Sequence, residues 1–168
     1  MWVLAVGLSA VGLSAVGTGV VGSPVVAGRD ARAAALAPAP TSQSTGLDPE
    51  LERRFEAARA AATAAGVPFK IHSGRRSIDD QQRLVDQAVA RYGSEKVAHR
   101  FVLPPQASAH VTGLAIDVGP NAGVVWLEKY GVSYGLCQVY QNEPWHFEPL
   151  VEPGGDCPAV RPDASWAW

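Results

Sequence analysis

The sequence predicts an α+β domain, a small antiparallel sheet with helices packed on one side. Helix-like and strand-like patterns are mixed along the chain, without the strict β-α-β rhythm that is typical of a parallel sheet. The strand-like stretches are short and are separated by glycine and proline. Once its ends are set aside, the 168-residue chain leaves roughly 110 residues for the fold, which is enough for one modest core.

The N-terminal residues are not expected to belong to this fold. Residues 2–28 carry no charged side chain, and an Ala-rich stretch follows them, so residues 1–37 are predicted to be a secretory leader. A permanent N-terminal anchor is the alternative. Residues 38–46 are small, polar and Pro-containing and predict a linker, which leaves residues 47–158 for the domain and 159–168 for a tail. The protein is therefore expected to be exported, extracellular or cell-wall associated, and to meet a membrane only through an uncleaved leader.

The first helix is expected over residues 48–66. Asp48 is a favourable N-cap, Pro49 suits the first helical position, and Gly66 is a stop signal. Its apolar or small side chains recur at helical spacing: Leu51, Phe55, Ala58 and Ala62.

Two further helices have similar boundary signals. Ser77 and Asp80 have the spacing of a capping box, so a second helix is expected to begin there and to end at Gly93. The stretch "NAGVVWLEKYG", residues 121–131, predicts a third, shorter helix.

Three strands are expected between the helices. They are residues 67–73, which alternate apolar and polar side chains, the apolar run 113–119, and residues 133–140. Residues 94–106 are irregular in pattern and include two consecutive prolines.

The composition indicates which partners to expect and whether the cysteines are oxidised. The net charge is −2 and the basic residues do not cluster, so nucleic acid is not an expected partner. We expect a monomer. The two cysteines, Cys137 and Cys157, predict one disulfide in an exported chain, worth about 3 kcal/mol in the chain-entropy estimate.

The stretch "SAHVTGLAID" is the first candidate for chemistry. Asp117 follows His110 by seven residues, and on one straight strand this odd separation would place the two side chains on opposite faces. They can converge if the chain bends at Gly113. Asp117 closes an apolar run, at an expected strand end, and burying a lone carboxylate is costly unless a cation compensates. His72 and His99 are interpreted as ordinary imidazoles.

The stretch "NEPWHF" is the second candidate. Pro144 disrupts strand pairing, so Glu143 and His146 need not obey strand alternation. His146, His110 and Asp117 together provide two imidazoles and one carboxylate. This set suits catalytic Zn²⁺, because it leaves the fourth coordination position open. Glu143 would then take a proton from water and pass it to the leaving amine. The alternative is that these side chains hydrogen-bond one another without metal.

Three motifs together resemble one family. "SAHVTGLAID" matches S-x-H-x-x-G-x-A-x-D, "EPWH" matches E-x-W-H, and "SGRRS" matches S-G-x-R-S, in the order found in VanY-type zinc D-alanyl-D-alanine carboxypeptidases. The resemblance extends from Val67 to Pro149 and implies the α+β fold shared with the signalling domain of hedgehog proteins. Residue by residue, it implies that the zinc ligands are His110, Asp117 and His146.

The resemblance also implies roles for neighbouring residues. Glu143 corresponds to the catalytic base, and Arg76 to the arginine that stabilises the developing oxyanion. Ser108 corresponds to a motif serine near the substrate, and Trp145 is expected to wall the site. Arg75 stands where relatives commonly have an aromatic residue, and we interpret it as a solvated turn residue.

These observations predict a secreted zinc metallopeptidase that hydrolyses peptidoglycan stem peptides, as a D-alanyl-D-alanine carboxypeptidase. Two alternatives remain open at this stage. One is an endopeptidase that cuts between L-alanine and D-glutamate. The other is a non-catalytic module of the same fold that binds cell wall or a protein partner.

Overall fold

The computed structural model describes residues 45–167. The predicted leader, residues 1–37, and residues 38–44 of the predicted linker lie outside the described residues. Among residues 45–167, none of the helices is long and apolar enough to span a membrane.

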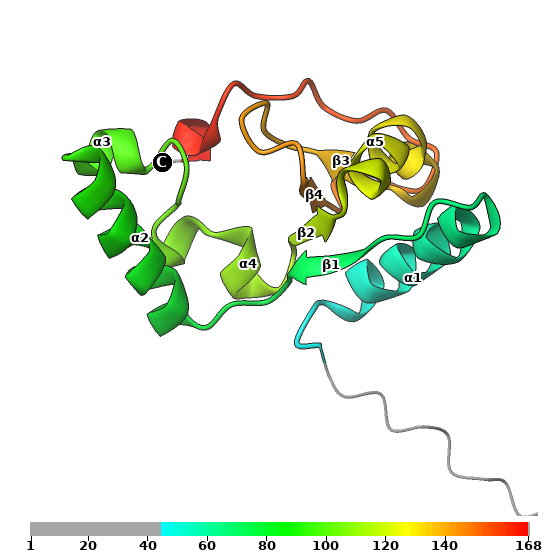
Figure 1. Ribbon diagram of the computed structural model, residues 1–168, viewed down its shortest axis with the longest axis horizontal. Helices are drawn as coiled ribbons and strands as arrows, with labels where there is room; N and C mark the ends of the chain where they lie inside the picture. Colours follow the sequence, from blue (N-terminus) through cyan, green and yellow to red (C-terminus); the bar gives the residue numbers. More distant parts are fainter. Residues whose placement is uncertain (1–44, 168) are drawn as a thin grey trace, which may run out of the picture. The chain divides into compact units, whose positions relative to one another are not determined.

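A four-stranded antiparallel sheet forms the centre of the fold (Figure 1). Its strands are β1 (Lys70–Ser73), β2 (Ile116–Gly119), β3 (Cys137–Gln138) and β4 (His146–Glu148), in the order β1-β2-β4-β3. The central position of β2 places Asp117 opposite His146 on one side and opposite Ser73 on the other. The sheet and its helices confirm the predicted α+β class.

Two helices and one face of the sheet enclose the main core. Helix α1 (Pro49–Ala64) begins with the Asp48 side chain accepting two backbone N–H groups, as predicted, and α5 (Asn121–Tyr130) follows β2. Ile116 and Val118 of β2 point into this core, so the alternation of the strand directs Asp117 to the opposite face. The buried residues of the core are Leu47, Leu51, Phe55, Ala58, Ala62, Phe69, Ile116, Val118, Val124, Leu127, Leu136 and Phe147.

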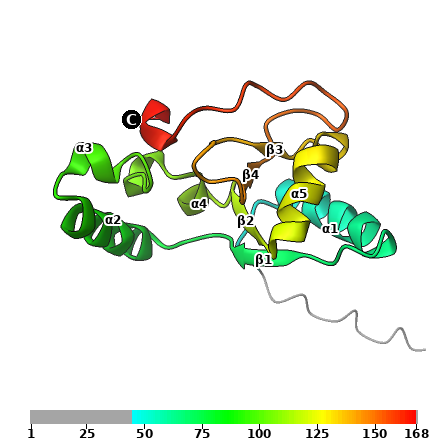
Figure 2. The same cartoon turned by 45° about the horizontal axis from the view of Figure 1, so that its top comes forward.

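The remaining helices lie on the other side of β1 and β2 from α1, as Figures 1 and 2 both show. They are α2 (Ile78–Tyr92), α3 (Glu95–Ala98) and α4 (Ala109–Thr112). Helix α2 begins and ends as predicted, with Ser77 as its N-cap and Gly93 in the left-handed conformation. A small second cluster of buried residues lies in this part: Leu103, Val139, Tyr140 and Ala164.

Several stretches differ from the sequence prediction, which included neither the strand β4 nor the short helix α4. Residues 133–140 were expected to form one strand, but Gly131–Tyr134 form a 3₁₀ turn and only Cys137–Gln138 are strand. Gly135, with φ of 69°, ends that turn in a left-handed conformation that a strand cannot contain. Residues 94–106, expected to be irregular, include α3, because the Ser94 side chain caps it.

Candidate metal centre

Three side chains meet on the face of the sheet opposite the main core. His110 comes from α4, Asp117 from β2 and His146 from β4, and all three are buried. His110 Nε2 lies 3.2 Å from His146 Nδ1 and 3.3 Å from Asp117 Oδ1, and His146 Nδ1 lies 3.2 Å from the same oxygen. Three potential metal-ligand atoms therefore form a nearly equilateral triangle.

The size of this triangle fits zinc. Tetrahedral Zn²⁺ with bonds of about 2.0–2.1 Å places its ligand atoms roughly 3.3–3.4 Å apart. The three observed separations, 3.2 to 3.3 Å, agree with that value. The set also has the composition of catalytic zinc sites, which use three protein ligands and keep a fourth position open.

His110 is brought to the site by the bend predicted at Gly113. Gly113 has φ of 79° and ends α4, and an added Cβ would lie 2.8 Å from the Gly46 carbonyl oxygen. The chain between His110 and Asp117 therefore contains a helical turn and a left-handed glycine, and is not one straight strand. His110 Nδ1 donates to the carbonyl oxygen of Gly74 at 2.8 Å, which directs Nε2 to the triangle.

Asp117 is held by a neighbouring arginine. It lies within β2 rather than at the strand end expected from sequence, because the strand continues to Gly119. Its Oδ2 accepts a 2.8 Å hydrogen bond from Arg76 Nη2, which leaves Oδ1 for the triangle. Burial raises the pKa of Asp117, but hydrogen bonds from His110 and His146 outweigh burial and hold that pKa below its usual range.

His146 is oriented by a residue that the sequence reasoning missed. Its Nε2 donates to Glu148 Oε1 at 2.9 Å, so Nδ1 faces the triangle. Burial lowers the pKa of His146, but hydrogen bonds with Asp117 and Glu148 outweigh burial and raise it to about 9. The sequence did contain a signal for this contact. His146 and Glu148 are two residues apart in "HFE", and residues at that spacing share one face of a strand.

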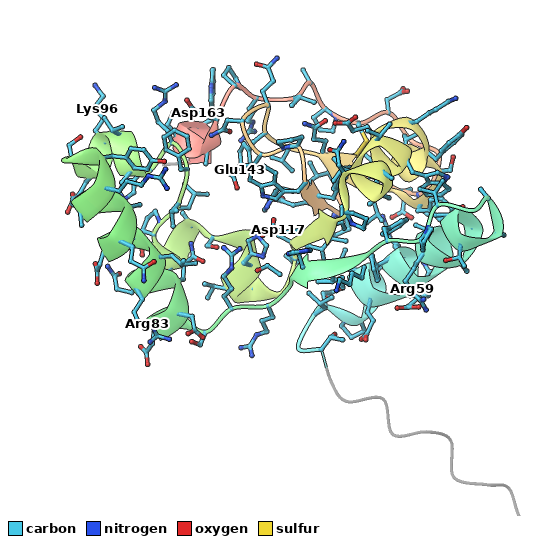
Figure 3. All side chains as sticks on the ribbon, viewed as in Figure 1. Arg59, Arg83, Lys96, Asp117, Glu143 and Asp163 are labelled. Carbon is cyan, nitrogen blue, oxygen red and sulfur yellow. A yellow bond between two sulfur atoms is a disulfide. The ribbon has the colours of Figure 1, made fainter. Side chains whose placement is uncertain are left out.

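Glu143 lies at the same site on a turn. His146 N–H donates to the Glu143 carbonyl oxygen at 3.0 Å, so Pro144 and Trp145 occupy the corners of the turn. Figure 3 shows Glu143 near Asp117 in the middle of the molecule. Burial and the charge of Asp117 raise the pKa of Glu143 to about 7, against the opposing charges of His146 and Arg76.

Arg76 reaches the site and Arg75 does not. Beyond its bond to Asp117, the Arg76 guanidinium donates from Nε to Ser73 Oγ at 3.0 Å and from Nη1 to Gln81 Oε1 at 3.3 Å. Two of its five N–H groups are not used by these three bonds. Arg75 is exposed and packs on Gly46, as expected for a turn residue.

Two cavities adjoin the triangle. The smaller, about 30 Å³, is lined by His110, His146, Glu143, Arg76 and Ser108, among others. The larger, about 380 Å³, is lined by Asp117 and Trp145 with residues of β1 and the start of α5. The structure thus brings Ser108 to the cavity that contains Glu143, whereas Trp145 walls the other one.

The VanY family, described as D-alanyl-D-alanine carboxypeptidase, matches residues 44–149. The chain belongs to the VanY family. It is 29% identical over 126 residues to a D-alanyl-D-alanine carboxypeptidase of Enterococcus faecalis, covering 60% of this chain and 46% of that protein. It is 30% identical over 109 residues to the putative carboxypeptidase YodJ of Bacillus subtilis, covering 51% of this chain and 40% of that protein. The chain thus spans less than half the length of these VanY-like relatives.

Solved structures show the same fold. The VanY D,D-pentapeptidase of a VanB-type resistance cassette, solved with Zn(II), has a TM-score of 0.58 and 27% identity, covering 62% of this chain and 73% of that one. The L,D-carboxypeptidase LdcB has a TM-score of 0.54 and 26% identity, covering 61% of this chain and 58% of that one. The family resemblance predicted from three short motifs is therefore confirmed.

Proposed function

We propose that this protein is an exported zinc carboxypeptidase that removes the terminal D-alanine from peptidoglycan stem peptides. The observation that carries the proposal is the triangle of His110 Nε2, Asp117 Oδ1 and His146 Nδ1, with Glu143 on the wall of the adjoining cavity. Membership of the VanY family and the Zn(II) complex of a VanY structure support the same metal and reaction class.

The charges around the triangle favour a divalent cation. Asp117, Glu143 and Glu148 bring three carboxylates together, and Arg76 is the cation hydrogen-bonded to one of them. Burial, and to a smaller extent the charge of Asp117, raises the pKa of Glu143 to about 7. Bound zinc would supply positive charge that lowers the pKa of a water and polarises the scissile carbonyl.

The chain's own residues would perform the proton transfers. Glu143, as a carboxylate, accepts a proton from the attacking water and donates it to the leaving amine. Arg76 holds Asp117 through Nη2, and its unused N–H groups would stabilise negative charge on the carbonyl oxygen. Ser108, whose hydroxyl makes no cap hydrogen bond at α4, would contact the substrate in the smaller cavity. One chain supplies all of these groups, which is consistent with a monomer.

The L,D-carboxypeptidases among the structural relatives support a second candidate. Such an enzyme would remove D-alanine from a tetrapeptide stem, where the preceding residue has the L configuration. Removal from a pentapeptide stem, after a D-alanine, remains the first proposal because the matched family is described as D-alanyl-D-alanine carboxypeptidase.

Digestion of purified muropeptides tests the proposal. Mass spectrometry should show pentapeptide stems converted to tetrapeptides, and Glu143→Ala should abolish this conversion. Conversion of tetrapeptides to tripeptides alone would support the L,D-carboxypeptidase. Cleavage between L-alanine and D-glutamate would contradict both, and unchanged muropeptides would identify a non-catalytic module.

A further inference from the structure

The residues after the family match run back to the site. The match ends at residue 149, and the predicted tail, residues 159–168, had no assigned role. In the structure Ala164 is buried in the small cluster and lines the smaller cavity together with Glu143 and His110. Trp166 is exposed, and Trp168 lies outside the described residues.

The segment 157–164 is fixed at its beginning and along its length. Cys157 is joined to Cys137 by a disulfide, which confirms the predicted pair. Arg161 then pairs with the chain before Glu143, because its N–H donates to Val139 O at 2.9 Å and its carbonyl accepts from Gln141 N at 2.8 Å. The segment is therefore held beside the strand-like stretch that leads to the proposed base.

Arg100 joins the end of this segment to the Glu143 turn. Its Nε donates to Asp163 Oδ2 at 2.6 Å, and Asp163 also accepts from the backbone N–H of Ser165 at 3.0 Å. The Arg100 carbonyl oxygen accepts from Ala164 N at 3.3 Å and from Asn142 Nδ2 at 2.8 Å. One residue of the stretch that follows α3 thus fixes both Ala164 and the residue beside Glu143.

The two cavities differ in volume, and Ala164 lines the smaller one. The larger one, about 380 Å³, has room for the body of a stem peptide. The smaller one, about 30 Å³, is walled by Ala164 and by Phe101 and Val102. A peptide crossing the triangle from the larger cavity into the smaller one would therefore have space for little beyond the scissile bond.

We propose that residues 157–164 hold Ala164 in place as a fixed wall of the smaller cavity, and that this wall restricts hydrolysis to the last residue of a peptide. The inference rests on the proposed function, since it explains why that activity would be exopeptidic. Ala164 is the specificity-determining residue that faces the cavity. Arg100 and Asp163 are positioning residues, because they act through the placement of Ala164.

The test compares two peptides in the full-length, zinc-loaded protein. One is diacetyl-L-lysyl-D-alanyl-D-alanine, and the other is the same peptide with one glycine added at its C-terminus. Products are identified by mass spectrometry, and kcat/KM is measured for each. The variants are Asp163→Ala and Arg100→Gln, which remove the ion pair from either side. Asp156→Ala is the matched control, because Asp156 is an exposed carboxylate immediately before this segment.

In the parent protein and the control, hydrolysis of the D-alanyl-D-alanine bond should favour the shorter peptide by about tenfold or more, as expected when a pocket must reject one extra group. In Asp163→Ala and Arg100→Gln the preference should fall to about threefold or less. The extended peptide should then lose a D-alanyl-glycine dipeptide. Hydrogen exchange of residues 159–167 should be faster in both variants than in the control.

Three results would overturn the inference. The first is a parent protein that releases D-alanyl-glycine from the longer peptide as readily as it releases D-alanine from the shorter one. The second is faster exchange of 159–167 with an unchanged preference, which would give the segment a structural role alone. The third is unchanged exchange in both variants, since the wall would then not depend on this pair. Failure of the parent to cleave either peptide would instead overturn the proposed function, and this inference with it.

Discussion

The part of the molecule on one side of β2 is stabilised by different interactions from the part on the other side. The part formed by α1, α5 and the inner face of the sheet has a continuous apolar core. The part formed by α2 to α4 and the C-terminal segment has only four residues in its buried cluster, Leu103, Val139, Tyr140 and Ala164. Here hydrogen bonds fix the buried polar groups, as when Gln81 Nε2 donates to Leu103 O at 2.7 Å.

This difference indicates a division of roles. Apolar burial is non-directional and stabilises the fold roughly in proportion to area, so the first part can supply most of the stability. Hydrogen bonds are directional and contribute little net stability each, but they fix the orientation of side chains. The triangle lies between the two parts, with Asp117 and His146 on the sheet and His110 on α4.

Replacing the proposed base gives the largest expected effect. Glu143→Gln keeps the shape of the side chain but removes its ability to accept a proton, so kcat should fall by about 10²–10⁴-fold. Zinc content and thermal stability should stay close to those of the parent. Glu128→Gln, an exposed position on α5, is the control. An unchanged kcat in Glu143→Gln would exclude Glu143 as the base.

Two leucine truncations measure the difference between the parts directly. Leu51→Ala in the main core should lower the free energy of unfolding by about 3–5 kcal/mol, and Leu103→Ala in the small cluster by about 2–3 kcal/mol. The gap arises because Leu51 is completely buried in the larger cluster and Leu103 lies in the smaller one. Urea denaturation of both variants gives the comparison. A greater loss in Leu103→Ala would reverse our account of where stability resides.

Removing the carboxylate behind His146 should have an intermediate effect. Glu148→Gln keeps the length of the side chain but weakens the 2.9 Å hydrogen bond that orients the imidazole. Zinc affinity should fall by about 10–100-fold, as is typical for groups that orient metal-bound histidines. Competition with a chromophoric chelator measures it, again beside Glu128→Gln. Equal affinities would show that Glu148 does not position His146.

The smallest expected effect is the release of a proton when zinc binds. At pH 7 the metal-free protein should carry a proton on His146, whose pKa is raised to about 9. Zinc needs the unprotonated nitrogen, so metal uptake should release this proton, and affinity should rise with pH until about pH 9. Titration in weakly buffered solution at pH 7 measures the release. Zinc uptake without any proton release would contradict the protonation assigned to His146.

Local signals in the sequence predicted the first part well. The cap at Asp48 and the stripe of Leu51, Phe55, Ala58 and Ala62 lie within one helix, and all four stripe residues are buried as expected. The site residues were also accessible from sequence, since "SAHVTGLAID" and "NEPWHF" each contain their groups within a short stretch. What the motifs could not give is how Asp117 and His146 pair across β2 and β4.

The second part was harder to predict because its contacts are distant in sequence. Arg76 meets Asp117, Gln81 meets Leu103, and Arg100 meets Asp163 only after the chain has folded. Gln81, Arg100 and Asp163 each look like an ordinary polar surface residue in the sequence. The role of the tail was missed for the same reason, because nothing local in "RPDASWAW" indicates that Asp163 pairs with Arg100 or that Ala164 lines the cavity of Glu143.

The most direct test of the central claim is metal analysis of the purified protein. Our account predicts close to one zinc per chain in the parent, near-complete loss in Asp117→Ala, and retention in Glu143→Gln. Carboxypeptidase activity should disappear with a chelator and return with zinc. A parent protein without zinc, whose activity is unaffected by a chelator, would contradict the assignment of His110, Asp117 and His146 as a metal centre.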